Sequence, residues 1–165
     1  MLRSVWLACL LWSSAGYGGA VDDHFANPFP GIEWGATLQR LQSRYANGIS
    51  TGGLRGERGV AFVMPGDTEL PGIDVAAQLV TFAFAQDGTL ENVCFYFNYA
   101  NRDVVLYKLA ESLGHDYKAT DTASGRTIWW KPGSKTRAQL TIGSSPNSWA
   151  YLQIYPVSSV SSGQQ

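Results

Sequence analysis

Two short runs in the sequence combine histidine with carboxylates, the residue types that hold metal ions or relay protons. Asp22-Asp23-His24 carries three potential ligands in a row, and His115 stands next to Asp116. Adjacent side chains on one segment rarely converge on a single ion. The spacing of His115 and Asp116 to any serine is not diagnostic of a hydrolytic triad. We therefore predict no metal site and no catalytic residue here, and we place His115 at a helix end, where it faces the helix dipole.

Three further features resemble reactive sites without completing one. The segment 48–59 contains five glycines with Arg55 and Arg58, but it lacks the Gly-Lys-Ser/Thr ending of a phosphate-binding loop, so we predict a mobile contact loop. Glu33 with Asp67 and Glu69 could supply a carboxylate pair for glycoside cleavage, although 13 acidic residues offer many such pairs. Cys94 falls in a predicted strand without a partner that would activate it, so we expect it to be packed.

The composition excludes several classes of protein. Charged residues make up 15% of the 165 residues, against about 25% in ordinary domains. The 12 Lys and Arg nearly balance the 13 Asp and Glu, which argues against a nucleic-acid-binding protein. Two cysteines are too few for a disulfide scaffold or a cysteine-based zinc site. We predict no cofactor. Aromatic residues reach 13% and must find a place in the fold.

The first 20 residues have the pattern of a secretory signal peptide. Arg3 precedes an apolar run over residues 5–12, and small residues follow up to Ala20. The run is too short to span a bilayer, which needs about 20 residues. Cys9 lies in a poor lipobox context, so lipid attachment is not predicted. We expect cleavage near Ala20, a periplasmic location, no integral membrane segment after signal removal, a single domain over 21–157 and a disordered tail over 158–165.

Hydrophobic periodicity predicts an α+β fold. Residues 37–46 and 101–113 have helical spacing, with Thr37 and Asn101 as N-caps. Strands are predicted over 60–64, 77–85, 90–99, 127–130, 138–142 and 149–155, with an Asp87-Gly88 hairpin turn. The predicted architecture is an antiparallel sheet of about six strands with two helices packed on one face, in the order α-βββ-α-βββ.

Alternation along these strands assigns side chains to two faces. The face toward the helices receives Val80, Phe82, Phe84, Val93, Phe95, Phe97, Ile128, Trp130, Ala138, Leu140, Ile142, Ala150, Leu152 and Ile154. The opposite face receives polar residues interleaved with rings, from which we predict the binding residues Tyr96, Trp129, Arg137, Trp149, Tyr151 and Tyr155. Trp, Tyr and Arg are enriched at contact hot spots. Cross-strand aromatic pairs that only stabilise an exposed sheet are the alternative interpretation.

The opening of the predicted domain resembles a known group of proteins. The run Pro30-Gly31-Ile32-Glu33-Trp34-Gly35-Ala36-Thr37 leads into the first predicted helix, as in many small exported bacterial proteins with a Gly-Ile-x-Trp-Gly opening. These are similar to the two-layer α/β group that includes β-lactamase inhibitor protein and the small outer-membrane assembly lipoprotein. Residues 107–114 and Trp129-Trp130-Lys131 resemble the second helix-to-sheet step of that group. The chain lacks the lipobox of the lipoprotein and the paired cysteines of the inhibitor.

That resemblance implies an α+β fold and a non-enzymatic, protein-binding role. We expect a periplasmic protein whose partner is a toxin, a hydrolase or an envelope component, and whose role is that of an inhibitor or immunity protein. An accessory protein of the outer membrane is one alternative. A glycan-binding or peptidoglycan-acting protein is another, and as an enzyme it requires a cleft with His115 or an acidic pair of perturbed pKa.

Overall fold

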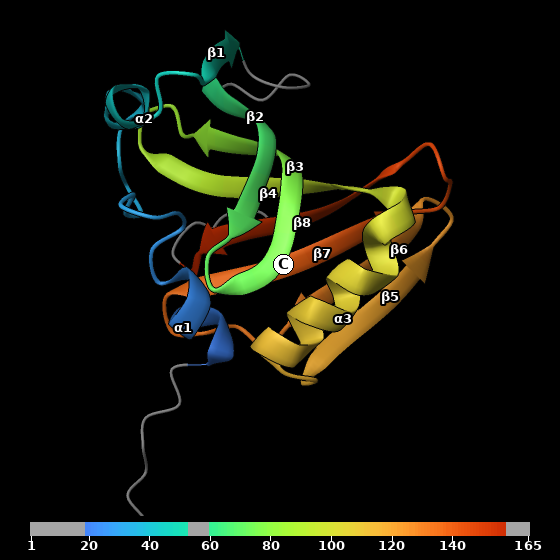
Figure 1. Cartoon of the computed structure of the whole chain (residues 1–165). Helices are drawn as coiled ribbons and strands as arrows, with labels where there is room; N and C mark the ends of the chain where they lie inside the picture. The colour runs from blue at the N-terminus through green and yellow to red at the C-terminus, as the bar shows by residue number, and fades with distance from the viewer. Residues whose placement is uncertain (1–18, 53–59, 158–165) are drawn as a thin grey trace, which may run out of the picture.

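The computed structural model describes residues 19–52 and 60–157. Within that part of the chain, helices and strands follow one another from blue to red in Figure 1. In chain order they are α1 (Ala20–Phe25), α2 (Leu38–Arg44), β1 (Ile49–Gly52), β2 (Val60–Leu70), β3 (Ile73–Phe84), β4 (Leu90–Asn98), the 3-10 turn η2 (Tyr99–Asn101), α3 (Arg102–Leu113), β5 (Tyr117–Thr122), β6 (Gly125–Trp130), β7 (Thr136–Gly143) and β8 (Trp149–Pro156). Apart from residues 19 and 20, the predicted signal peptide lies outside the described residues, as does the predicted tail over 158–165.

The strands form a single antiparallel sheet in the order β1-β2-β3-β4-β8-β7-β6-β5. Strands β1 to β4 make one meander and β5 to β8 a second. The two meanders join at the centre, where β4 pairs with β8 from Val93↔Ile154 to Asn98↔Trp149. The last strand of the chain therefore lies in the middle of the sheet, and the two edges are β1 and β5.

The predicted count of six strands and two helices is wrong. The described chain has an eight-stranded sheet, and helix α1 precedes the two predicted helices. Strand β1 falls in the predicted contact loop, whose residues 53–59 lie outside the described part. The order α-βββ-α-βββ becomes two helices, four strands, one helix and four strands.

The missing elements escape prediction for a physical reason. Strand β5 is an edge strand, and all six of its side chains are exposed. Alternation appears only where one face of a strand is buried, so β5 shows none. Helix α1 has only six residues, and three of them are aspartate or histidine. Its sequence therefore shows no apolar periodicity and is typical of a polar segment that precedes a domain. It buries Val21 and Phe25 nevertheless.

The predicted inward face is confirmed. Every residue assigned to it is buried, and Phe82, Phe95, Leu140, Leu152 and Ile154 have no exposed surface at all. Val105, Leu109 and Leu113 of α3 join the same core, as do Leu41 of α2 and Phe25 of α1. Figure 1 shows α3 crossing in front of the second meander, with its C-terminal end beside α1. The opposite side of the sheet, which we call the helix-free face, carries none of these helices.

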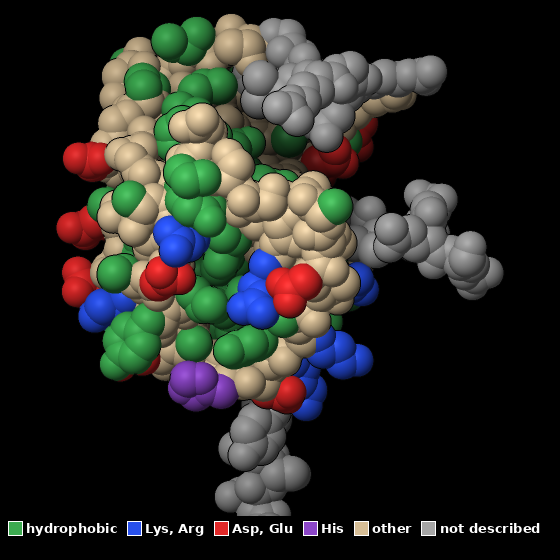
Figure 2. All heavy atoms as spheres, turned by 90° about the vertical axis from the view of Figure 1, so that its right-hand side faces the viewer, with side chains coloured by type: hydrophobic (Ala, Val, Ile, Leu, Met, Phe, Trp, Pro, Cys, Tyr) green, Lys and Arg blue, Asp and Glu red, His purple; other side chains and the backbone are tan. Residues whose placement is uncertain are grey.

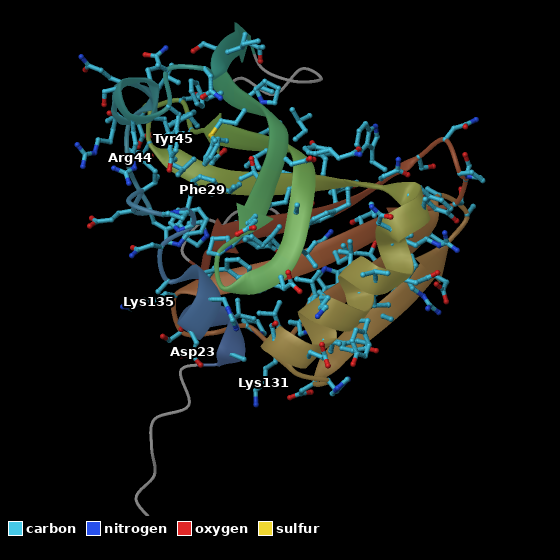
Figure 3. The ribbon with its side chains drawn as sticks, in the orientation of Figure 1. Asp23, Phe29, Arg44, Tyr45, Lys131 and Lys135 are labelled. Atoms are coloured by element: carbon cyan, nitrogen blue, oxygen red, sulfur yellow. The ribbon has the colours of Figure 1, made fainter. Side chains whose placement is uncertain are left out.

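The turn before α2 fixes the start of β4. Gly31 and Gly35 both have positive φ, of 73° and 82°, a conformation that side chains disfavour. Ile32, which lies between the two glycines, is buried. The backbone N–H of Gly35 donates to the carbonyl of Leu90 at 3.3 Å. Tyr45 donates from Oη to the carbonyl of Pro30 at 2.9 Å. Its ring meets that of Phe29, and both residues are labelled in Figure 3. Of the two predicted N-caps, Thr37 is confirmed, since its Oγ1 accepts from the N–H of Arg40, whereas Asn101 precedes α3 without a side-chain cap hydrogen bond.

Asp22 ties α1 to the connection between β6 and β7. Its carboxylate accepts backbone N–H groups from Ser134 at 2.6 Å and Thr136 at 2.9 Å, and also the Ser134 hydroxyl at 2.8 Å. Burial alone would raise the pKa of Asp22, but these hydrogen bonds together hold it below its ordinary value. A Cβ on Gly133 would collide with the carboxylate, so the loop approaches α1 closely. Figure 3 shows Asp23, Lys131 and Lys135 around this junction.

Replacing Asp22 with asparagine is expected to lower the free energy of unfolding by about 2 kcal/mol at neutral pH, because charge-assisted hydrogen bonds are lost. The folded-state pKa is depressed, so the stabilisation is present above the unfolded-state pKa of about 4 and is lost as the pH falls through the folded-state value. Urea unfolding followed by tryptophan fluorescence, from neutral pH down into the acid range, measures both effects. The two proteins should converge in acid, and equal stability at neutral pH would contradict the assignment.

Candidate binding face on the sheet

All six predicted binding residues lie on the helix-free face. Tyr96 comes from β4, Trp129 from β6 and Arg137 from β7, while β8 supplies the rest. Each is the direct sequence neighbour of at least one buried core residue, so strand alternation turns it to the other side of the sheet. Trp149 and Trp129 are 46% and 37% exposed, and the other four are half-buried.

Three of the rings form a cluster at the β4–β8 junction. Tyr96 and Tyr151 are directly opposite one another in the ladder, with ring centroids 5.7 Å apart. Trp149 meets Tyr96 edge to face at 6.2 Å with an interplanar angle of 89°. Rings in such arrangements attract one another beyond their buried area. The cluster therefore presents a preorganised aromatic surface with its largest ring, Trp149, nearly half exposed.

Trp129 is held apart from that cluster by a polar chain. Its indole Nε1 donates to Gln139 Oε1 at 2.9 Å, and Gln139 Nε2 donates to Thr141 Oγ1 at 3.3 Å. Thr141 pairs across the ladder with Tyr151, which belongs to the ring cluster. The amide thus fixes the orientation of the indole and connects the two aromatic groups across β7. Sequence reasoning placed Gln139 on this face but could not foresee the bond.

Arg137 and Tyr155 form the other end of the face. They are cross-strand partners in the β7–β8 ladder. Tyr155 lies six positions after Trp149 along β8, which is roughly 20 Å of extended strand. The predicted residues are therefore not one compact site but a strip along β8, with rings at one end and the guanidinium at the other. Lys118 of β5, opposite Trp129, also belongs to this face. Sequence reasoning misses Lys118 because it misses β5.

Cys94 has the register of the helix-free face, opposite Gln153 in the β4–β8 ladder, but its side chain is covered. It is 4% exposed, and burial raises the pKa of its thiol to about 12. Burial also raises the pKa of the neighbouring Tyr96, whose hydroxyl interacts with Cys94 and Thr81. A thiol with so high a pKa stays protonated and is a poor nucleophile. The predicted packed position of Cys94 is confirmed.

The side chains that the sequence offered for a metal site or a catalytic centre lie in different parts of the structure. The carboxylate of Asp22 is hydrogen-bonded to the β6–β7 loop. His24, from α1, lies beside Gly72, a residue of the turn between β2 and β3. No group of His, Cys, Asp and Glu suited to a metal ion occurs in residues 19–52 and 60–157. One further run, Gly48-Ile49-Ser50-Thr51-Gly52, has the spacing of a nucleophile elbow. That motif needs a strand–turn–helix context, whereas Ser50 lies within edge strand β1 and accepts from Gln42.

A groove of about 310 Å³ lies where α3 begins, beside the ends of β5, β6 and β7. His115 is not part of its lining. Asp121 in this groove receives two hydrogen bonds from Arg126, the shorter at 2.7 Å, and these lower the pKa of Asp121. A glycosidic acid needs the opposite, a raised pKa. Figure 2 views the molecule from this side and shows cationic and anionic side chains next to one another, with no patch of one sign.

The thiol of Cys94 is expected to resist modification until the protein unfolds, because it is buried and protonated. The full chain with Cys9→Ser leaves Cys94 as the single thiol for Ellman's reagent. Labelling at mildly alkaline pH should be slow in the folded state and complete within minutes in guanidinium chloride. Rapid labelling of the folded chain would show that the β4–β8 junction opens locally.

Comparison with known proteins adds no assignment. The chain matches no protein-family model, no curated protein and no solved structure. Within the described residues, no helix has the length and apolar character needed to cross a membrane. The helix-free face, with its rings and its one arginine, is the surface from which a function can be derived.

Proposed function

We propose that this protein is a non-catalytic, periplasmic binding protein that grips another protein through the helix-free face. The partner would be a toxin, a hydrolase or an envelope component, and the role that of an inhibitor or immunity protein. The observation that carries the proposal is the ring cluster of Tyr96, Trp149 and Tyr151 on a face that the hydrophobic core does not use.

The energetics of the rings favour a contact surface. A solvated sheet face reaches ordinary stability with threonine and charged residues, and a cross-strand aromatic pair adds only about 0.2–1 kcal/mol. Burying a tryptophan or tyrosine under a partner contributes more, and such anchors cost about 2 kcal/mol or more when truncated. Trp149 has the exposed surface for this, while its contact with Tyr96 restrains its rotamer.

The dimensions of the face also suit a protein partner. Eight strands at about 4.8 Å spacing give a sheet roughly 35 Å wide, and the central strands are roughly 20 Å long. A flat rectangle of these dimensions covers about 700 Å², which is of the same order as the ~800 Å² of accessible surface that each side of a standard interface buries. A partner would centre on β8, between the ring cluster and Arg137.

Export is part of the same proposal and rests on the pattern of residues 1–20. Cleavage near Ala20 retains Asp22 and with it the connection between α1 and the β6–β7 loop. A cut beyond Asp22 would remove that connection, so the mature chain is expected to begin at or before Asp22.

Glycan binding is a second candidate, favoured by the bond between Trp129 and Gln139. An indole with a fixed amide beside it offers a sugar both a stacking surface and a hydrogen-bonding group. Accessory function at the outer membrane is the remaining alternative, and it would use the same face.

Pull-down of periplasmic proteins with the purified protein tests the proposal. The Trp149→Ala/Tyr151→Ala double variant should weaken the main interaction by at least about 10-fold, measured by calorimetry with the recovered partner. Val104→Ala/Tyr107→Ala is the matched control, since these apolar side chains of α3 are 59% exposed and lie on another surface. The control should bind as the wild type does, with unchanged melting temperatures for both variants.

Three results would redirect the assignment. Unchanged binding by the Trp149→Ala/Tyr151→Ala variant would exclude the ring cluster as the contact. Retention of the wild type on purified peptidoglycan, lost on Trp129→Ala, would favour the glycan candidate. Co-purification with outer-membrane machinery alone would favour the accessory role.

A further inference from the structure

We propose that Arg137 binds a carboxylate of the partner, so that the helix-free face recognises an acidic segment of another protein. The inference rests on the proposed function and adds to it the chemistry of the partner. It concerns the end of the face opposite the ring cluster, where the guanidinium and Tyr155 meet across β7 and β8.

Arg137 has unused hydrogen-bonding capacity in the free protein. Its side chain is half-buried, and its guanidinium group makes no hydrogen bond to another described residue. The Nε lies below the surface, so a partner would meet the terminal Nη groups. No ion pair to Arg137 occurs in that part of the chain either. Buried donors normally find a partner, and a charged one left without a partner calls for an explanation.

The other arginines of the described chain that have hydrogen bonds show the contrast. Arg126 is bound by Asp121, and Arg102 lies 4.3 Å from the Tyr99 ring centre and 3.3 Å from Asp103. Arg44 donates to the carbonyl of Pro30. These three guanidinium groups are matched within the protein, and that of Arg40 is exposed to water. Among the half-buried arginines of the described chain, Arg102 has partners and Arg137 has none.

The charges on this face have one sign. Of the positions that the strand register places on the helix-free face from Val93 to β5, Arg137 and Lys118 carry charge and none is aspartate or glutamate; Glu91 lies at the bulge that precedes them in β4. The acidic residue of β5, Asp121, points to the other face, where it meets Arg126. Amides at Gln139 and Gln153 border Arg137 and are neutral. A partner's carboxylate would therefore be attracted to Arg137 without a neighbouring carboxylate of this face competing for the guanidinium.

The geometry favours an acidic protein segment over a small anion. The guanidinium presents a planar fork that suits a carboxylate, and its half-buried stem loses little freedom on binding. Arg137 and Trp149 are roughly 20 Å apart along the strip, which an extended segment of about six residues spans. One partner segment can therefore place an apolar residue on the rings and an Asp or Glu on Arg137.

Selection from a phage-displayed library of random peptides of about 12 residues tests this. The full chain is the bait, beside Arg137→Gln, the charge-reversed Arg137→Glu, and Arg126→Gln as the matched control. The wild type and the control should select peptides rich in Asp or Glu, whereas Arg137→Glu should select Lys and Arg. A synthetic selected peptide should lose about 10-fold in affinity when its acidic residue becomes the amide, and Arg137→Gln should abolish that difference.

The outcomes separate this inference from the proposed function. No selected peptides, peptides without acidic residues, or unchanged acidic selection by Arg137→Gln would overturn the role of Arg137. Loss of the same peptides by Trp149→Ala/Tyr151→Ala would at the same time support the ring cluster. If those peptides bind the Trp149→Ala/Tyr151→Ala variant as tightly as the wild type but depend on Arg137, the carboxylate site stands and the aromatic contact is excluded.

Discussion

The antiparallel pairing of β4 with β8 is the contact on which the rest of the structure depends. It joins two four-stranded meanders that would each expose an apolar edge alone, and it brings Phe95 against Leu152 and Phe97 against Ala150 in the core. The same ladder places Tyr96 opposite Tyr151 on the other face. A slip of one residue would turn the rings into the core and the phenylalanines to solvent. The core and the helix-free face are therefore fixed by a single register.

Around this junction, a small number of polar side chains hold particular elements or rings in place. Asp22 holds α1 on the β6–β7 loop through backbone donors more than 100 residues away. Gln139 holds the indole of Trp129, and Gly31 and Gly35 shape the turn that meets Leu90. The low charge content thus reflects a molecule in which several buried polar groups each determine one local geometry.

Alternation in the sequence predicted both faces of the central strands correctly, because those strands have one buried side and one exposed side. It could not reveal β5, whose side chains are all exposed, or α1, whose place depends on Asp22 meeting a distant loop. The same limit applies to the candidate site. Alternation put Trp149 and Arg137 on one face, but their separation along β8, the Gln139 bond to Trp129 and the unmatched Nε of Arg137 all arise from contacts between strands.

The position of β8 has a consequence for how the chain reaches its fold. Because synthesis proceeds from the N-terminus, β4 emerges more than 50 residues before its partner β8. During that interval the edge that carries Val93, Phe95 and Phe97 is open to any other extended chain. Vectorial emergence thus creates an aggregation-prone intermediate that ends only when the final strand inserts. A binding chaperone or rapid completion of the chain would protect it.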